Sequence, residues 1–303
     1  MSPADTALRR VIATFENAFP DRIRGYYVHG SVADNTSIAT SDVDLDVVVK
    51  GGFTEPEEHV AFVQAVRAIA ASSDLEVDID VTDEASLFDG AEPTFKLGSR
   101  LLHGEDIRAQ VPLLSIDQWG RERMYRGYFL LVRVFHRPSR VRYPIGFPDP
   151  DAEFFGYADR RVSLGDGTDV PSTRDLMRVT GWLATALIAH EGKQYVARKR
   201  DCHRLYREVF HDEWASLLED IYVTCRGRWR CLIPDDPGDR DHLLRICTRV
   251  LAFENYFLAR FQPFLLAELR RAEHGEESRA LWLMREIPLE DDEVLGTLQD
   301  LSL

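Results

Sequence analysis

The sequence predicts an α/β domain followed by a helical domain, and two patterns carry that prediction. In the first third of the chain, short apolar segments of strand length alternate with segments of helical periodicity. From about residue 116 onward, apolar residues recur at helical spacing with long interruptions. We therefore expect two domains, 1–112 and 113–303, each long enough to bury its own core.

The first domain is expected to contain an ordered series of helices and strands. Short apolar segments that end at turn residues predict buried strands, and the segment before Gly51-Gly52 is an example. Proline followed by acidic residues is typical of a helix start. In order, the expected elements are a helix over 5–19, strands over Gly25–His29 and Val43–Lys50, a helix that begins at Pro56, and a strand over Leu75–Thr82.

The second domain is expected to be helical throughout its regular parts. A long segment rich in Pro, Gly and Asp, Pro138–Pro171, predicts an irregular connection of the kind that is often functional. The helices are expected over Arg121–His136, after a cap at Ser172 or Thr173, and over Lys199–Phe210, Glu213–Thr224 and His242–Glu268.

The net charge of -14 is unevenly distributed along the chain. Residues 1–110 carry 20 acidic against 9 basic residues, so the first domain holds most of the excess. An acidic surface repels nucleic acid and attracts cations, which disfavours a polyanionic acceptor. Two basic stretches, Arg198–Arg204 and Arg226–Arg230, could still contact phosphates, although a solvated helix face is the ordinary role of such stretches.

Composition also predicts the compartment. No apolar run reaches the about 18 residues that a membrane-spanning helix needs, and the first residues lack the pattern of an export signal. We expect a cytoplasmic protein without membrane partners. The four cysteines form no Cys-x-x-Cys pair, so reduced and buried thiols are expected. Zinc at Cys225, Cys231 and a neighbouring histidine is the alternative, at a spacing that matches no usual finger.

Carboxylates gather on two of the expected strands. Side chains at alternate strand positions share a face, so Asp42, Asp44 and Asp46 point away from the core. Two carboxylates ~4 Å apart repel each other by roughly 4 kcal/mol at an effective dielectric of about 20, so a divalent cation such as Mg²⁺ is the simplest counter-ion. The third strand repeats the pattern with Glu76, Asp78 and Asp80.

A glycine and a serine follow the first strand directly. Gly30 permits close backbone approach, and Ser31 offers a hydroxyl and an N–H to an anion. This is neither a Walker loop, which requires Gly-Lys-Ser/Thr, nor part of a calcium loop, which would require Gly at position 47 and Glu at position 53. No Lys or Arg lies between Ser31 and Asp42, so positive charge for a phosphate must come from elsewhere.

The combination of Gly30-Ser31 with Ser41-Asp42-Val43-Asp44-Leu45 resembles the nucleotidyltransferase superfamily, which includes DNA polymerase β and the antibiotic adenylyltransferases. The resemblance implies a catalytic domain with a mixed sheet, and it assigns Asp42 and Asp44 as metal ligands. The third carboxylate is expected to be Asp78, with Asp80 and then Glu76 as the alternatives. Arg100–Asp106 is similar to the segment that closes the family's catalytic domain.

The two-domain layout is most similar to that of the streptomycin/spectinomycin adenylyltransferases. A segment in that group that is similar to Val196–Cys202 carries a lysine that reaches the nucleotide phosphates, which implies this role for Lys199. The resemblance implies two Mg²⁺ ions, ATP or another NTP, and transfer of NMP, best AMP, to a hydroxyl. An aminoglycoside-like acceptor suits the acidic first domain. The alternatives are a tRNA or protein acceptor, or a non-catalytic partner protein of the antitoxin kind.

Overall fold

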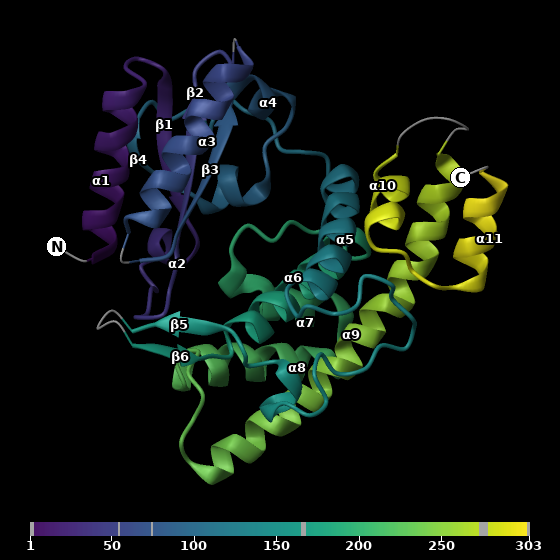
Figure 1. Cartoon of the computed structure of the whole chain (residues 1–303). Coiled ribbons are helices and arrows are strands. Elements are labelled where there is room, and N and C mark those ends of the chain that lie inside the picture. The colour runs from purple at the N-terminus through teal and green to yellow at the C-terminus, as the bar shows by residue number, and fades with distance from the viewer. Residues whose placement is uncertain (1–2, 54, 74, 165–167, 273–277, 302–303) are drawn as a thin grey trace. The chain divides into compact units, whose positions relative to one another are not determined.

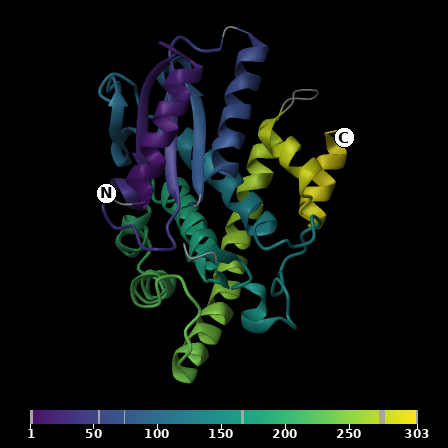
Figure 2. The ribbon, with the colours of Figure 1, turned by 60° about the vertical axis from the view of Figure 1, so that its left-hand side comes forward.

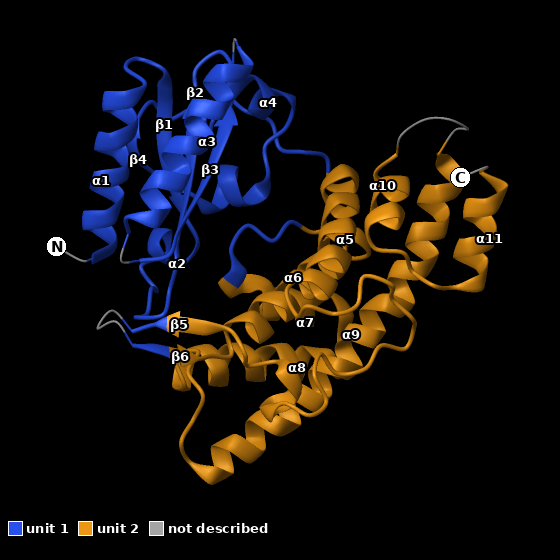
Figure 3. Cartoon of the chain, viewed as in Figure 1, with its two compact units in different colours: residues 1–115, 163–169, 195–199 blue, residues 116–162, 170–194, 200–303 orange. Residues whose placement is uncertain are grey.

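The computed structural model describes residues 3–53, 55–73, 75–164, 168–272 and 278–301 of the chain, which divides into two compact units (Figures 1 and 3). The first unit comprises residues 1–115 together with 163–169 and 195–199. The second comprises residues 116–162, 170–194 and 200–303. Two short segments from later in the sequence therefore belong to the first unit, and one of them carries Lys199.

A four-stranded mixed sheet forms the centre of the first unit, which confirms the predicted fold class. Its strands are β1 (Ile23–His29), β2 (Val43–Val49), β3 (Val77–Asp83) and β4 (Arg100–Gly104). The spatial order is β3-β2-β1-β4, with β2 and β3 parallel and the other two pairs antiparallel. Strand β4 lies in the segment that was expected only to close the domain.

One face of the sheet is covered by two long helices, α1 (Pro3–Ala18) and α3 (Pro56–Ala71), which run along the strands (Figures 1 and 2). Phe15 of α1 and Phe62 of α3 are completely buried and stack on each other with ring centroids 5.9 Å apart. The strand residues of this core are those predicted to point inward, Val43, Leu45 and Val47 among them. The alternation in β2 thus leaves its aspartates on the other face.

The opposite face has a smaller apolar core beyond the carboxylates. Tyr27 and Val48 pack there with Leu87 of the short helix α4 (Glu84–Asp89) and with Phe95 of a π-helical segment, Thr94–Gly98. This core covers only part of the face, because β1 and β2 continue beyond it to His29 and Asp44.

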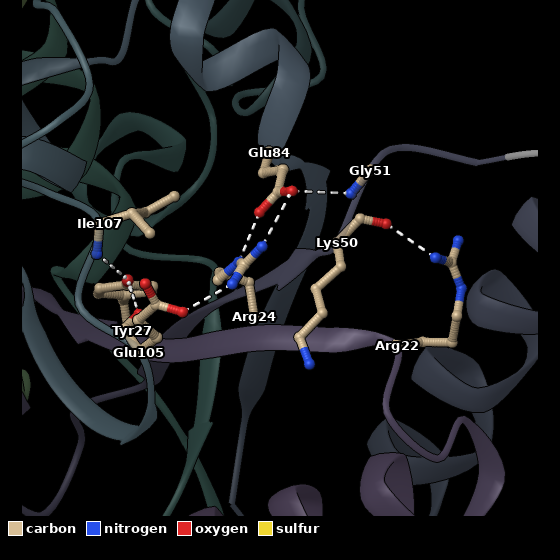
Figure 4. Close-up of polar contacts among 8 residues, drawn as sticks. All are labelled: Arg22, Arg24, Tyr27, Lys50, Gly51, Glu84, Glu105 and Ile107. Atoms are coloured by element: carbon tan, nitrogen blue, oxygen red, sulfur yellow. Dashed lines mark hydrogen bonds and ion pairs between the residues drawn. The ribbon is translucent and has the colours of Figure 1, made fainter.

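A network of ion pairs and hydrogen bonds closes the end of the sheet where β1 begins (Figure 4). Arg24 donates to Glu84 and to Glu105, at 2.6 Å in each case. Glu84 also accepts the backbone N–H of Gly51 at 3.0 Å, at the turn after β2. The hydroxyl of Tyr27 donates to the backbone oxygen of Glu105 at 2.8 Å. These contacts connect β1, β4, α4 and the turn after β2.

The second unit is mainly helical, as the fold class predicted. Its helices are α5 (Ile116–Arg133), α6 (Arg174–His190), α7 (Cys202–Phe210), α8 (Trp214–Asp220), α9 (Pro237–Arg271), α10 (Arg279–Glu286) and α11 (Asp292–Asp300). Shorter helical segments of this unit are Glu153–Gly156 and the π-helical Ile221–Arg228, and a further one, Lys199–Asp201, begins in the first unit.

Several details of this part of the chain differ from the expectations, including α10 and α11, which were not predicted, and α5, which begins at Ile116 and not at Arg121. The segment expected to be irregular contains a pair of short strands, β5 (Arg161–Ser163) and β6 (Asp169–Pro171). Thr173 precedes α6, but its side chain makes no capping hydrogen bond to the helix backbone. Packing of the apolar face of α6 explains the helix without that cap, because Leu176, Leu183 and Leu187 are completely buried.

A buried ion pair lies within the second unit. Arg137 donates to Glu254 of α9 at 2.6 Å, and the hydroxyl of Tyr157 donates to the same carboxylate oxygen at 2.6 Å. The Glu254 side chain is completely buried and that of Arg137 is 5% exposed, so neither charge could be left alone there without a large desolvation cost. This network is an architectural contact.

The cysteines are free and buried, as expected. Burial raises the pKa of Cys202 to about 11 and that of Cys247 to about 12, which makes these thiols unreactive near neutral pH. Across the described ranges, the groups with metal-ligand spacing do not include Cys225 and Cys231, so the zinc alternative has no support. None of the described helices has the length and apolar character needed to cross a bilayer.

Candidate functional site

Parallel pairing of β2 with β3 brings carboxylates together at one end of the sheet. The register places Asp44 beside Asp78, and the backbone N–H of Val43 donates to the oxygen of Glu76 at 3.0 Å. One ligand oxygen each from Asp42, Asp44 and Asp78 lies within 4.8 Å of the others. Asp42 and Asp44 are half-buried, and Asp78 is exposed. We refer to these three residues as the aspartate group.

The other predicted carboxylates of the third strand are not in this group. Asp80 lies two residues further along β3, where the register places it beside Asp46. Glu76 precedes β3 and is exposed. Among the described residues, the aspartate group therefore includes Asp78 and neither of its two alternatives.

The Gly-Ser turn lies directly against the aspartate group. β1 ends at His29, and Gly30 begins the short turn helix α2 (Gly30–Ala33) with a φ of +66°. The positive φ favours glycine, and a Cβ atom on Gly30 would lie 2.5 Å from Oδ2 of Asp44, so any other residue would displace that carboxylate. The Oγ of Ser31 is buried and has no hydrogen-bond partner in the described structure. A buried hydroxyl without a partner is unusual and is suited to a ligand.

The loop between the turn and β2 holds its own shape. The N–H of Thr36 donates to the oxygen of Ser31 at 2.9 Å, and the N–H of Ser41 donates to the oxygen of Ile38 at 2.9 Å. The hydroxyl of Ser41 accepts the N–H of Ile38 at 3.0 Å. Ser41 thus fixes the chain immediately before Asp42, which gives the serine of the Ser-Asp-Val-Asp motif a structural role.

Two cationic side chains from the 195–199 segment of the first unit reach this region. The Nζ of Lys199 lies 3.6 Å from Oδ2 of Asp44, and its side chain is 66% exposed. The Nε of Arg198 lies 3.0 Å from Oδ1 of Asp34, as an ion pair without the alignment of a hydrogen bond. Asp34 follows α2 directly. The structure thus places Lys199, expected to serve the site from outside the Gly-Ser loop, beside a member of the aspartate group.

His29 is a feature that the sequence analysis did not identify. Its Nε2 lies 3.5 Å from Oδ1 of Asp46, and both side chains are largely buried. Burial alone would lower the pKa of His29, but contact with Asp46 and the charges of Asp46 and Asp44 outweigh it and raise the pKa above its ordinary value. The signal was present in the sequence, because His29 directly precedes the Gly-Ser pair.

The donor set fits a hard divalent cation. Three carboxylate groups offer oxygen ligands, and the exposed position of Asp78 leaves room for water and a substrate at the same centre. Half-buried carboxylates that converge in this way repel one another, so binding of a cation relieves an existing cost.

The two basic stretches are engaged in contacts of other kinds. Arg204 pairs with Asp201 and Glu208 on its own helical segment, and Arg228 pairs with Asp239. Surface ion pairs of this kind are typical of solvated helices. These contacts give no support to a phosphate-binding role for the stretches as a whole.

Comparison with known proteins gives similarities among solved structures. No protein-family model matches the chain, and no curated protein matches it significantly. Among solved structures, it is similar to spectinomycin adenyltransferase AAD(9) from Enterococcus faecialis, determined with ATP and spectinomycin. The similarity covers 82% of this chain and 99% of that chain, at 11% sequence identity and a TM-score of 0.48.

Proposed function

We propose that this chain is a Mg²⁺-dependent nucleotidyltransferase that moves NMP, best AMP from ATP, to a hydroxyl of a small cationic acceptor. The observation that carries the proposal is the aspartate group beside Gly30 and Ser31, since converging carboxylates next to a buried, unpartnered hydroxyl suit a metal-bound phosphate. Residues 1–112 would form the catalytic domain, and 113–303 the helical domain.

The reaction would be an in-line displacement at the α-phosphorus. The acceptor oxygen forms the new P–O bond, the bond to the β-phosphate oxygen breaks, and pyrophosphate leaves with the electron pair. When bound, Mg²⁺ would lower the pKa of the acceptor hydroxyl and neutralise charge on the triphosphate. Asp42 and Asp44 would hold the two ions, and Asp78 would complete the group. The alternative role for Asp78 would be to accept the proton of the hydroxyl.

Two groups of this chain would bind the triphosphate directly. Ser31 would donate its hydroxyl, which in the described structure has no hydrogen-bond partner. Lys199 would exchange its contact with Asp44 for one with a phosphate oxygen, because Asp44 is then neutralised by metal. Asp80 would remain beside Asp46 and act only through its charge.

The acceptor is proposed to be an aminoglycoside-like polycation. The first 110 residues carry 20 acidic and 9 basic residues, so this part of the chain attracts a cation and repels a polyanion. A tRNA end would have to overcome that repulsion, and a protein acceptor is the other alternative.

The experiment that tests the proposal uses ATP labelled at the α-phosphate. The full-length protein is incubated with this ATP, Mg²⁺ and separate pools of aminoglycosides, tRNA and lysate protein. We expect label in the aminoglycoside pool, with release of pyrophosphate and no transfer by Asp44→Asn. Label only in the tRNA or the protein pool would mean that the acceptor is of that class and is not an aminoglycoside. No label in any pool, together with no binding of ATP, would support a non-catalytic partner protein instead.

A further inference from the structure

The 195–199 segment is attached to the first unit at several points. The Tyr195 hydroxyl donates to the backbone oxygen of Leu114 at 2.6 Å, and Val196 is buried. Arg198 pairs with Asp34, and Lys199 then lies at Asp44. Tyr195 to Ala197 belong to no helix or strand, so these attachments and not a regular element fix the position of the segment.

Gly98 provides the closest approach between this segment and the rest of the unit. A Cβ atom at position 98 would lie 2.2 Å from the backbone oxygen of Ala197 and 3.2 Å from its carbonyl carbon. The clash would be with backbone atoms, so no rotation of a side chain could relieve it. Gly98 has no left-handed φ, and the requirement for glycine here is therefore one of space.

Gly98 itself cannot retreat easily. It ends the π-helical segment Thr94–Gly98, whose Phe95 is packed in the core with Tyr27. Ser99 donates its hydroxyl to the oxygen of Phe95, which ties the end of the segment back to that core. Any side chain at position 98 must therefore move the 195–199 segment.

We infer that Gly98 is a positioning residue for Lys199. By admitting the backbone of Ala197, it seats the 195–199 segment on the first unit, and the seated segment holds Lys199 at Asp44 and Arg198 at the end of the Gly-Ser turn. This inference rests on the proposed function, in which Lys199 binds the triphosphate. A lysine on a seated segment loses less conformational freedom on binding than one on a free segment, so seating raises nucleotide affinity.

The test compares Gly98→Ala with Gly181→Ala in the full-length protein. Gly181 lies within α6, and a Cβ atom there meets nothing within 4 Å, so this variant is a matched glycine-to-alanine control. The rate of limited trypsin cleavage after Arg198 and Lys199 measures how firmly the 195–199 segment is held on the first unit, because a protease cleaves a segment only when it is detached. Titration calorimetry with ATP and Mg²⁺ reports affinity. Tyr195→Phe, which removes the hydrogen bond to Leu114, is the milder variant if Gly98→Ala does not fold.

We expect Gly98→Ala to be cut faster at these two sites than the parent and Gly181→Ala, with other sites unchanged. Its affinity for ATP should fall about ten- to a hundred-fold, the effect expected for loss of a charged hydrogen bond. In a Lys199→Ala background, the same change should have no further effect, since there is no lysine left to position.

Two outcomes would overturn the inference while leaving the proposed function intact. One is a Gly98→Ala protein that binds ATP as the parent does. The other is a Gly98→Ala, Lys199→Ala double variant whose loss of ATP affinity is the product of the two single losses, because Gly98 would then act independently of Lys199. A parent protein that binds no ATP would instead refute the proposed function, and this inference with it.

Discussion

The two ends of the four-stranded sheet both carry charged side chains, but they hold them differently. At the end where β1 begins, Arg24 contacts Glu84 and Glu105 at 2.6 Å each (Figure 4). At the end where β1 finishes, the cation contacts are longer, 3.6 Å from Lys199 to Asp44 and 3.5 Å from His29 to Asp46. The first end is a closed ion-pair network, whereas at the second end the cations beside Asp44 and Asp46 lie at longer distances.

The difference indicates which end is architectural and which end binds a ligand. The hydrogen bond from Arg24 lowers the pKa of Glu84, so this pair neutralises itself over a wide range of pH. At the other end, three carboxylates converge within 4.8 Å beside an unpartnered buried hydroxyl. Carboxylates that converge in this way beside a buried hydroxyl without a hydrogen-bond partner are typical of a binding site.

The largest effect is expected from Asp44→Asn. Loss of a metal ligand should lower nucleotide transfer by more than about 100-fold, since even second-layer residues of metal sites contribute about 10- to 100-fold. Thermal unfolding should show an unchanged or slightly raised stability, because one of three repelling charges is removed. Glu84→Gln is the matched control at the opposite end of the sheet and should retain transfer activity. Equal activity of Asp44→Asn and the parent would remove the distinction between the two ends.

The third strand sharpens the comparison further. We expect Asp78→Ala to reduce transfer about as strongly as Asp44→Asn, and Asp80→Ala to reduce it by about 10-fold or less, through charge alone. The reason is the register, which places Asp78 beside Asp44 and Asp80 beside Asp46. Both aspartates are exposed, so the two variants form a fair pair. An inactive Asp80→Ala beside an active Asp78→Ala would mean that the third carboxylate lies two residues later.

A smaller effect is expected from Lys199→Ala. If Lys199 moves from Asp44 to a phosphate, its loss should weaken ATP binding by about 1.5–3 kcal/mol, or about ten- to a hundred-fold. Calorimetric titration with ATP and Mg²⁺ measures the change, and Lys193→Ala, another exposed lysine, which pairs with Asp117, is the control. Identical ATP affinities for Lys199→Ala and the parent would make Lys199 a solvated residue.

The smallest effect is expected at the architectural end, and it depends on pH. Arg24 lowers the pKa of Glu84 in the folded protein, so the pair stabilises the fold above the unfolded-state pKa, and this stabilisation is lost as pH falls through the folded-state pKa. Glu84→Gln should therefore lower the free energy of unfolding by about 1–2 kcal/mol at pH 7, because the pair is partly exposed. Urea unfolding at a series of pH values measures this. A deficit that stays constant down to pH 3 would contradict the linkage.

Local sequence patterns predicted much of this arrangement. Strands β1 and β2, the outward face of the aspartates and the turn at Gly30 all depend on neighbours within a few residues, where periodicity and glycine placement are informative. Local patterns were not enough to predict the pairing of Asp44 with Asp78, because this pairing depends on the register of two strands that are more than 30 residues apart.

The contacts that the sequence did not predict are long-range. The close approach of the Ala197 backbone to Gly98 involves residues 99 positions apart in the sequence. Nothing near Gly98 in the sequence distinguishes it from an ordinary turn glycine. The contact from His29 to Asp46 likewise appears only when β1 pairs with β2. Strand β4 was missed because its short, polar sequence has little alternation, and pairing with β1 makes it a strand.

The central claim is that the aspartate group binds a divalent cation and the Arg24 network does not. Titration with Mn²⁺, followed by electron paramagnetic resonance, measures this without any nucleotide or acceptor. Three proteins are compared: the parent, Asp44→Asn and Glu84→Gln. We predict that the parent and Glu84→Gln bind Mn²⁺ alike and that Asp44→Asn loses binding. Equal Mn²⁺ binding by Asp44→Asn and the parent would contradict the claim.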